Sequence, residues 1–183
     1  MIPTLIKTQT ASGSGEIDFL DGTSDVVFDD TYDHYMFVCT NINPGTNNVH
    51  FQFQAQEVGA SGWDVPMTTN FFSDYHLESN ADAGLGYHAD YDQAGTTAAY
   101  QTLSREIGSG SDESTAGILH IFQPASTVFV TQFVSRFMAH VHDDAAKGSF
   151  MGGYINMTDA VDSIQFKMSS GDFDGVIDMY GIA

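Results

Sequence analysis

Basic residues are scarce in this sequence, and their scarcity excludes several functions. Five Lys and Arg stand against 24 Asp and Glu, which gives a formal net charge of −19 at pH 7. A surface this negative repels the phosphates of nucleic acids and the headgroups of anionic membranes. We therefore expect no nucleic-acid partner and no membrane partner, and we interpret the charge as a solvated, salt-tolerant surface.

Cysteine is nearly absent as well. Cys39 is the only one, so no internal disulfide can form, and its apolar surroundings at 35–39 predict a buried thiol without a nucleophilic role. No apolar run reaches membrane-spanning length, and residues 1–7 lack the basic start and apolar centre of a signal peptide. These features predict a soluble protein that is made in the cytosol.

Familiar catalytic motifs are also missing. The sequence has no G-x-S-x-G elbow, phosphate-binding loop, dinucleotide fingerprint or H-E-x-x-H pair. Five basic residues are too few to suggest the positive cradle of a phosphoryl-transfer site, and 24 acidic residues form carboxylate pairs by chance. We expect a protein that is not an enzyme, with no catalytic residues and no cofactor.

Apolar residues, by contrast, are plentiful enough for a folded core. They make up 42% of the chain, and Phe, Trp and Tyr make up 13%. A chain of 183 residues with this composition buries enough surface to fold without disulfides. The expected organisation is one β-sandwich domain over residues 1–183.

Alternation of apolar and polar residues is the dominant pattern. Residues 49–57, VHFQFQAQE, place Val49, Phe51, Phe53 and Ala55 on one face of a half-buried strand. Residues 127–137, TVFVTQFVSRF, predict a strand that is covered on both faces. Further strands are expected at 2–8, 16–20, 34–40, 71–77, 85–88, 118–122, 150–157, 164–168 and 175–180. Six side chains are expected in the core: Phe51, Phe53, Phe129, Phe133, Ile164 and Phe166.

The predicted fold class is all-β: an antiparallel β-sandwich, jelly-roll-like, with at most one short helix. Short strands separated by Gly, Ser, Asn and Asp turns are typical of such folds. The helix is expected within 92–107, where Ala98, Leu103 and Ile107 give an imperfect helical stripe.

Histidines and acidic residues offer weak candidates for a metal site. On a strand, His140 and His142 would point to the same face, beside Asp143 and Asp144. A third ligand would have to come from another histidine: His34, His50, His76, His88 or His120. The interpretation we favour is two surface histidines at the end of a strand, with a pH-sensitive subunit contact as an alternative.

Two acidic stretches could supply oxygens to Ca²⁺. The first holds Asp21, Asp25, Asp29, Asp30 and Asp33, and the second holds Asp82, Asp90 and Asp92. Neither matches the spacing of an EF-hand, so we interpret both as solvated loops. The prediction is therefore that no residue binds a metal.

Aromatic residues in the middle third suggest a surface on which sugar rings could stack. They are Trp63, Phe71, Phe72, Tyr75, Tyr87 and Tyr91. The favoured interpretation is that they fill the core or a subunit interface.

The last two dozen residues carry a resemblance to a known group. Residues 164–182 follow the pattern I-x-F-x-x-S-S-G, then G-x-I-x-x-Y-G, which resembles the closing hairpin of small structural proteins of tailed bacteriophages, especially marine ones. In that hairpin, Ile164, Phe166 and Met168 form one apolar face and 176–180 return as the partner strand. Residues 5–7, 22–24, 35–38 and 41–44 are similar too.

The resemblance implies a jelly-roll-like protein of the virion. It favours a head decoration (cement) protein that stabilises the capsid, forms a homotrimer and contacts the major capsid protein or other virion proteins. The alternative is a tail or fibre module that binds a glycan on the host surface. A secreted lectin and a Ca²⁺-dependent hydrolase are disfavoured by the missing signal peptide and by the missing cluster of convergent polar residues.

Overall fold

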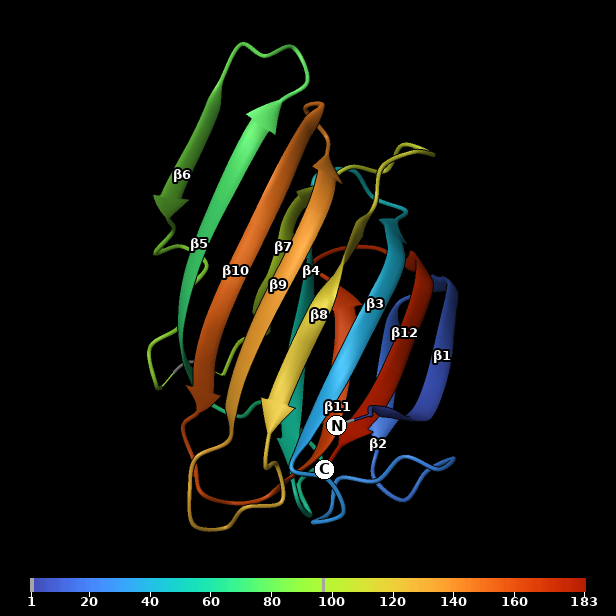
Figure 1. Ribbon diagram of the computed structural model, residues 1–183, viewed down its shortest axis with the longest axis vertical. Helices are drawn as coiled ribbons and strands as arrows, with labels where there is room; N and C mark the ends of the chain where they lie inside the picture. Colours follow the sequence, from blue (N-terminus) through green and yellow to red (C-terminus); the bar gives the residue numbers. More distant parts are fainter. Residues whose placement is uncertain (1, 97) are drawn as a thin grey trace.

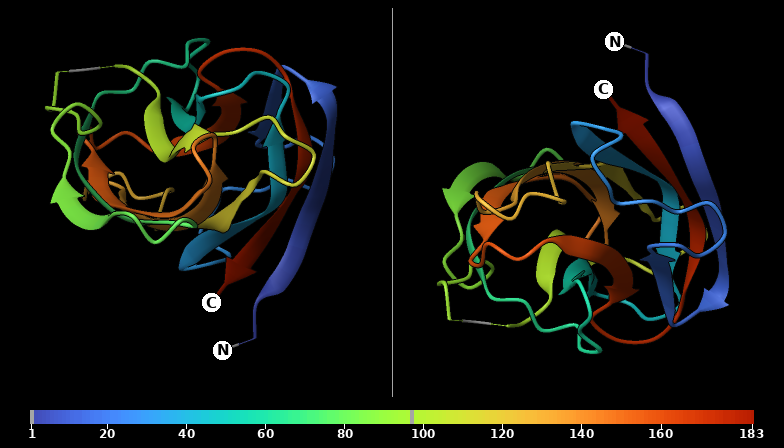
Figure 2. Two further views of the ribbon diagram at one scale, coloured as in Figure 1. Left: turned by 90° about the horizontal axis from the view of Figure 1, so that it is seen from above. Right: turned by 90° about the horizontal axis from the view of Figure 1, so that it is seen from below.

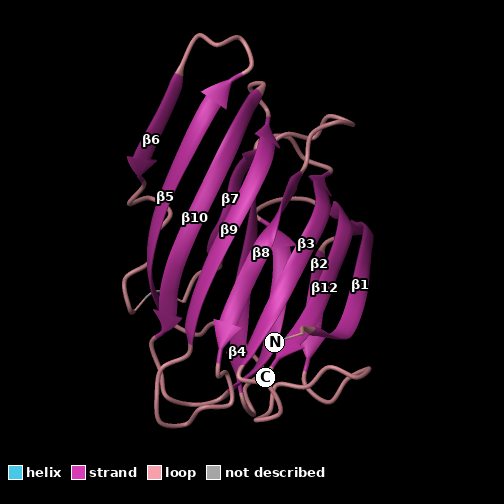
Figure 3. Cartoon of the chain, in the orientation of Figure 1, coloured by secondary structure: helices cyan, strands magenta, loops and turns pink. Residues whose placement is uncertain are grey.

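The computed structural model describes residues 2–96 and 98–183, and these residues form twelve β-strands and no helix (Figures 1 and 3). The strands are β1 (Thr4–Ser14), β2 (Glu16–Leu20), β3 (His34–Pro44), β4 (Val49–Glu57), β5 (Met67–Leu77), β6 (Ala83–Tyr87), β7 (Gln101–Ile107), β8 (Thr115–Phe122), β9 (Gln132–Val141), β10 (Ala145–Ile155), β11 (Val161–Met168) and β12 (Phe173–Ile182). All neighbouring strands run antiparallel. The prediction of an all-β antiparallel fold is confirmed.

Strand pairing divides the chain into two layers. A large sheet has the order β6-β5-β10-β9-β8-β3-β12-β1, and a small sheet has the order β7-β4-β11-β2. One residue pair, Ile107 opposite Val141, continues the pairing from β7 to β9, so the twelve strands form one nearly closed sheet. In Figure 1 the small sheet lies behind the large one, and Figure 2 shows both wrapped around a common interior.

The core between the layers is rich in phenylalanine. Phe166 is fully buried and contacts Phe51, Phe37 and Phe19, with ring centroids 5.7, 5.3 and 6.1 Å away. The alternating strand at 49–57 is confirmed as β4, with Val49, Phe51, Phe53 and Ala55 facing this core. Cys39 is buried as predicted, and burial raises the pKa of its thiol well above the ordinary value.

Three details of the predicted strands are wrong. The segment 127–131 is a loop, and Phe129 lies 71% exposed in it, whereas the other five predicted core residues are buried. β9 begins at Gln132 and is not covered on both faces, because Val134 and Met138 point to solvent. The closing hairpin is not a hairpin, since β11 pairs with β4 and β2 in the small sheet, whereas β12 pairs with β3 and β1 in the large sheet.

The helix expected within 92–107 is also wrong. Its second half is β7, in which every residue except Glu106 is buried. Ala98, Leu103 and Ile107 have a helical spacing, but residues 101–107 form a strand whose burial does not alternate, because its register against β4 shifts twice. Pairing with β4 decides the outcome, because hydrogen bonding to a neighbouring strand outweighs weak local helix propensity.

Candidate functional site

Two features of the molecule stand out chemically. One is the outer face of the large sheet, which is apolar in an acidic protein. The other is a group of charged and aromatic side chains around β7 and β10.

The outer face is built from side chains that alternate with the core residues of β3, β8, β9, β10 and β5. One row of laterally paired residues crosses these strands: Val38, Ile118, Arg136, Phe150 and Phe72. Val134 and Met138 flank the row on β9 and are 47% and 45% exposed. We call these seven residues the outer face.

Acidic residues are missing from the middle of this face. The four central strands, β3, β8, β9 and β10, contain no Asp or Glu, although the chain has 24. Arg136 supplies the one cation of the row, and its guanidinium lies 5.2 Å from the ring centre of Phe150, which stacks on Phe72 at 5.0 Å. The middle of the outer face thus lacks the carboxylates that repel other acidic surfaces, and the nearest ones on this side of the sheet lie at its borders, Asp74 on β5 and Asp178 on β12.

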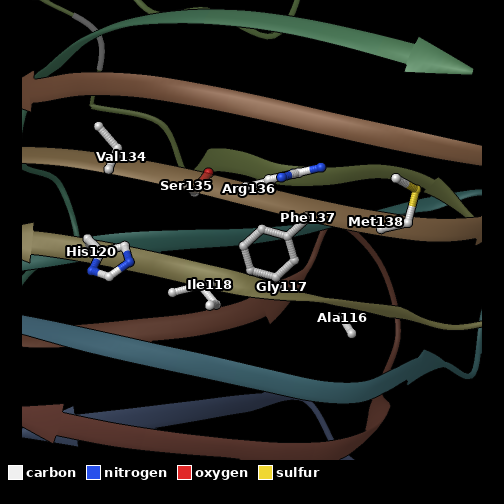
Figure 4. A pocket seen from close by; sticks show the side chains of 9 residues that line it. All are labelled: Ala116, Gly117, Ile118, His120, Val134, Ser135, Arg136, Phe137 and Met138. Carbon is white, nitrogen blue, oxygen red and sulfur yellow. The ribbon is translucent and has the colours of Figure 1, made fainter. Parts of the chain in front are cut away.

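A shallow hollow of about 530 Å³ lies on the outer face between β8 and β9 (Figure 4). Ile118, Val134, Arg136 and Met138 line it, together with His120. Gly117 is required here, because a Cβ at this position would lie 2.4 Å from both the ring of Phe137 and the carbonyl oxygen of Arg136. Burial, assisted by His34, lowers the pKa of His120 at the end of the hollow.

A second feature, which we call the interior cluster, lies where β4, β5, β7 and β10 meet the loop after β6: His50, Tyr75, His88, Tyr91, Arg105, Glu106 and Lys147. Arg105 and Lys147 are two of the five basic residues of the chain, yet they are only 8% and 5% exposed. Glu106 binds both. Its Oε1 lies 3.1 Å from Arg105 Nη1, and its Oε2 accepts a hydrogen bond from Lys147 Nζ.

A β-bulge makes this arrangement possible. Consecutive residues of a strand normally point to opposite faces, so Arg105 and Glu106 would not meet. The register between β4 and β7 shifts at this point, and Glu106 adopts the left-handed backbone conformation with φ +59°. The bulge turns its carboxylate back toward the interior, and its N–H donates to His50 Nδ1 at 3.1 Å.

Hydrogen bonding defines the protonation state of His50 and His88. His50 Nδ1 accepts a bond from the Glu106 N–H, and His88 Nε2 lies 3.3 Å from Arg105 Nη2, which can only donate. Each ring therefore keeps a lone pair and is neutral. Burial is the main reason why the pKa of both His50 and His88 lies below the ordinary value, and the neighbouring Arg105 adds to it.

Glu106 is ionised in this setting. Burial alone would raise the pKa of its carboxyl, but the bond from Lys147 and the charge of Arg105 outweigh that effect and hold the pKa low. Aromatic rings complete the shell, with Tyr91 5.3 Å from the Arg105 guanidinium and Tyr75 6.0 Å from Lys147 Nζ. Sequence reasoning missed this cluster, because the bulge and the contact between β7 and β10 depend on the pairing of distant strands. The rarity of basic residues was the one available signal.

The predicted metal candidates are only partly brought together. His140 is the penultimate residue of β9, whereas His142 lies in the turn after the strand, where its N–H donates to the Glu106 carbonyl, so the two histidines do not belong to one strand. Instead, ligand atoms of His140, Asp144 and Glu113 lie within 4.8 Å of one another, a donor set that Zn²⁺ or Mn²⁺ accepts. No other such group of three occurs in residues 2–96 and 98–183.

In the two acidic stretches that were weighed as calcium sites, aspartates accept hydrogen bonds from the backbone or from tyrosines. Asp21 accepts from the Phe28 N–H at 2.8 Å, and Asp29 accepts from the Thr31 N–H at 2.9 Å. Asp82 and Asp92 accept hydrogen bonds from the hydroxyls of Tyr75 and Tyr87.

The aromatic candidates do not form one stacking surface. Phe71 is in the core, Tyr75 and Tyr91 belong to the interior cluster, and Phe72 and Tyr87 lie side by side on β5 and β6 at the edge of the outer face. Trp63 lies half-buried in the loop before β5.

Comparisons with known proteins add no identity to these features, since no family model, curated protein or solved structure matches the chain. None of the described residues belongs to a helix long and apolar enough to cross a membrane.

Proposed function

We propose that the protein is a structural component of a tailed-bacteriophage virion: a head decoration protein that attaches to the capsid through the outer face. The observation that carries the proposal is this apolar, acid-free face on a chain of net charge −19. Large apolar patches on soluble proteins typically mark protein–protein contacts. The pattern at the C-terminus, which resembles small phage structural proteins, supports the same class.

The distribution of charge favours attachment by this face. A neighbouring subunit or capsid protein that meets the outer face encounters Val134, Met138 and Phe150 rather than carboxylates. Burying these side chains gains about 25 cal/mol for each Å² of apolar surface, and contact through the acid-free middle of the face avoids repulsion between carboxylates. The acidic remainder of the surface keeps decorated particles soluble.

The proposed partners are the major capsid protein and two further copies of the chain, in a homotrimer. Rotational symmetry would place three outer faces on one side of the assembly, directed at the capsid. Light scattering tests the stoichiometry, with an expected mass near three times 19.8 kDa. A stable monomer at the protein concentrations used for head binding would contradict the trimer.

Binding to undecorated phage heads tests the attachment. The wild-type protein should add to them stoichiometrically, and Val134→Asp should weaken binding at least about tenfold because it places a charge in an apolar contact. The matched control is Val58→Asp, since Val58 is 60% exposed on a loop outside the outer face. Equal binding by both variants, or attachment to host cells instead of heads, would contradict the proposal and favour a tail or fibre module.

A further inference from the structure

We propose that the interior cluster is a binding site for a small carboxylate, held by Arg105 and Lys147. This site is independent of the outer face, and the inference does not rest on the proposed virion function.

A count of charges leads to this proposal. Arg105 and Lys147 contribute two positive charges, Glu106 contributes one negative charge, and His50 and His88 are neutral, so the cluster carries one uncompensated positive charge. Burying an unpaired charge is costly, so such groups normally have counter-ions. Two further carboxylates beside the cluster, Asp82 and Asp90, belong to exposed residues, and Asp82 accepts a hydrogen bond from the Tyr75 hydroxyl.

Unused hydrogen-bond donors lead to the same ligand. Arg105 Nε is buried and has no partner, and Lys147 Nζ has three protons but one carboxylate partner among the described residues. Ser149 Oγ, which follows Lys147 on the inner face of β10, is also buried and unpartnered. A carboxylate offers two oxygens to such donors and supplies the missing negative charge.

Aromatic and imidazole groups give the site a rim. Tyr75, Tyr91, His50 and His88 are half-buried, so water reaches the edge of the cluster while the two cations stay covered. The rings of Tyr75 and Tyr91 already lie against the cations, and they provide apolar walls for a short carbon chain. A ligand that combines a carboxylate with a small apolar group fits both the buried cations and the aromatic rings beside them.

Titration of the ¹⁵N-labelled protein with sodium acetate, at constant ionic strength maintained with sodium chloride, tests the proposal. Saturable shifts of amides in β7 and β10 are expected, and Lys147→Met should lower the acetate affinity at least about tenfold while keeping the side-chain volume. Lys167→Met is the matched control, because Lys167 also lies against a tyrosine, with Nζ 4.5 Å from the Tyr100 ring centre, but outside the cluster. Its affinity should equal that of the wild type.

A second variant separates binding from folding. Glu106→Gln removes the competing carboxylate, so acetate should bind several-fold more tightly and should raise the Tm of this variant more than that of the wild type. Sulfate and phosphate, titrated in parallel, show whether the site prefers a planar carboxylate or accepts any oxyanion. The absence of saturable shifts with acetate, or equal affinities of Lys147→Met and Lys167→Met, would overturn the inference.

Discussion

Replacing Glu106 by Gln should strongly destabilise the protein. The substitution keeps the size of the side chain but leaves Arg105 and Lys147 without their shared counter-ion, and their side chains are only 10% and 6% exposed. Removing one partner of a buried ion pair costs roughly 3–5 kcal/mol. Because the Glu106 side chain itself is 25% exposed, we expect the lower end, about 3 kcal/mol. In a chain of this length, that corresponds to a fall in Tm of roughly 6–12 °C.

Urea denaturation, followed by circular dichroism and by the fluorescence of the single tryptophan, measures the change. Glu16→Gln is the control, because Glu16 is an exposed residue of β2, and it should change the free energy of unfolding by no more than about 0.5 kcal/mol. The double variant Glu106→Gln/Lys147→Met should recover part of the loss, since it removes one of the two orphaned charges. A loss below about 1 kcal/mol for Glu106→Gln, or a double variant less stable than the single one, would refute the ion-pair reasoning.

Three further predictions concern the core, the histidines and the thiol. Phe166→Ala should lower the free energy of unfolding by roughly 3–5 kcal/mol, whereas Phe129→Ala should change it by no more than about 0.5 kcal/mol; similar losses for both in urea denaturation would contradict the burial described. The pKa values of His50, His88 and His120 lie below 6.5 in the folded protein, so the unfolded chain binds protons first, and stability should fall as the pH drops below about 6.5. Thermal unfolding between pH 7.5 and pH 5 measures this loss of stability, and the loss should be smaller in the His88→Gln variant. A Tm that does not change with pH would contradict the prediction. Iodoacetamide should leave Cys39 unmodified in the native protein and alkylate it in urea, as mass spectrometry can show; rapid native labelling would exclude a buried thiol.

Local patterns were sufficient to predict most strands. In β4 the alternation of phenylalanine with glutamine fixes both the strand and its buried face, because a side-chain period of two leaves one arrangement that covers the rings. The same reasoning failed at 127–131, where Val128 and Phe129 continue the alternation but no neighbouring strand pairs with them. Alternation indicates that a segment can form a strand, whereas pairing decides whether it does.

Local sequence patterns could not predict which distant segments pair with one another. β11 and β12 are close in sequence and look like a hairpin, yet residues 169–172 carry the chain from the small sheet to the large one. The interior cluster has the same origin, since it requires the bulge at Glu106 and brings β7 against β10. The outer face could be anticipated in part, because alternation predicts an exposed side for each strand but not which strands lie next to one another.

The two edges of the large sheet determine how the protein can aggregate. β6 has only five residues, two of them glycines, and acidic residues precede and follow it. β1, at the opposite edge, carries two register irregularities and Lys7. Short, charged or bulged edges resist the addition of further strands, so amyloid-like growth along the hydrogen-bonding direction is blocked at both ends. A protein that exposes a broad apolar sheet face is therefore protected at its sheet edges from fibril formation.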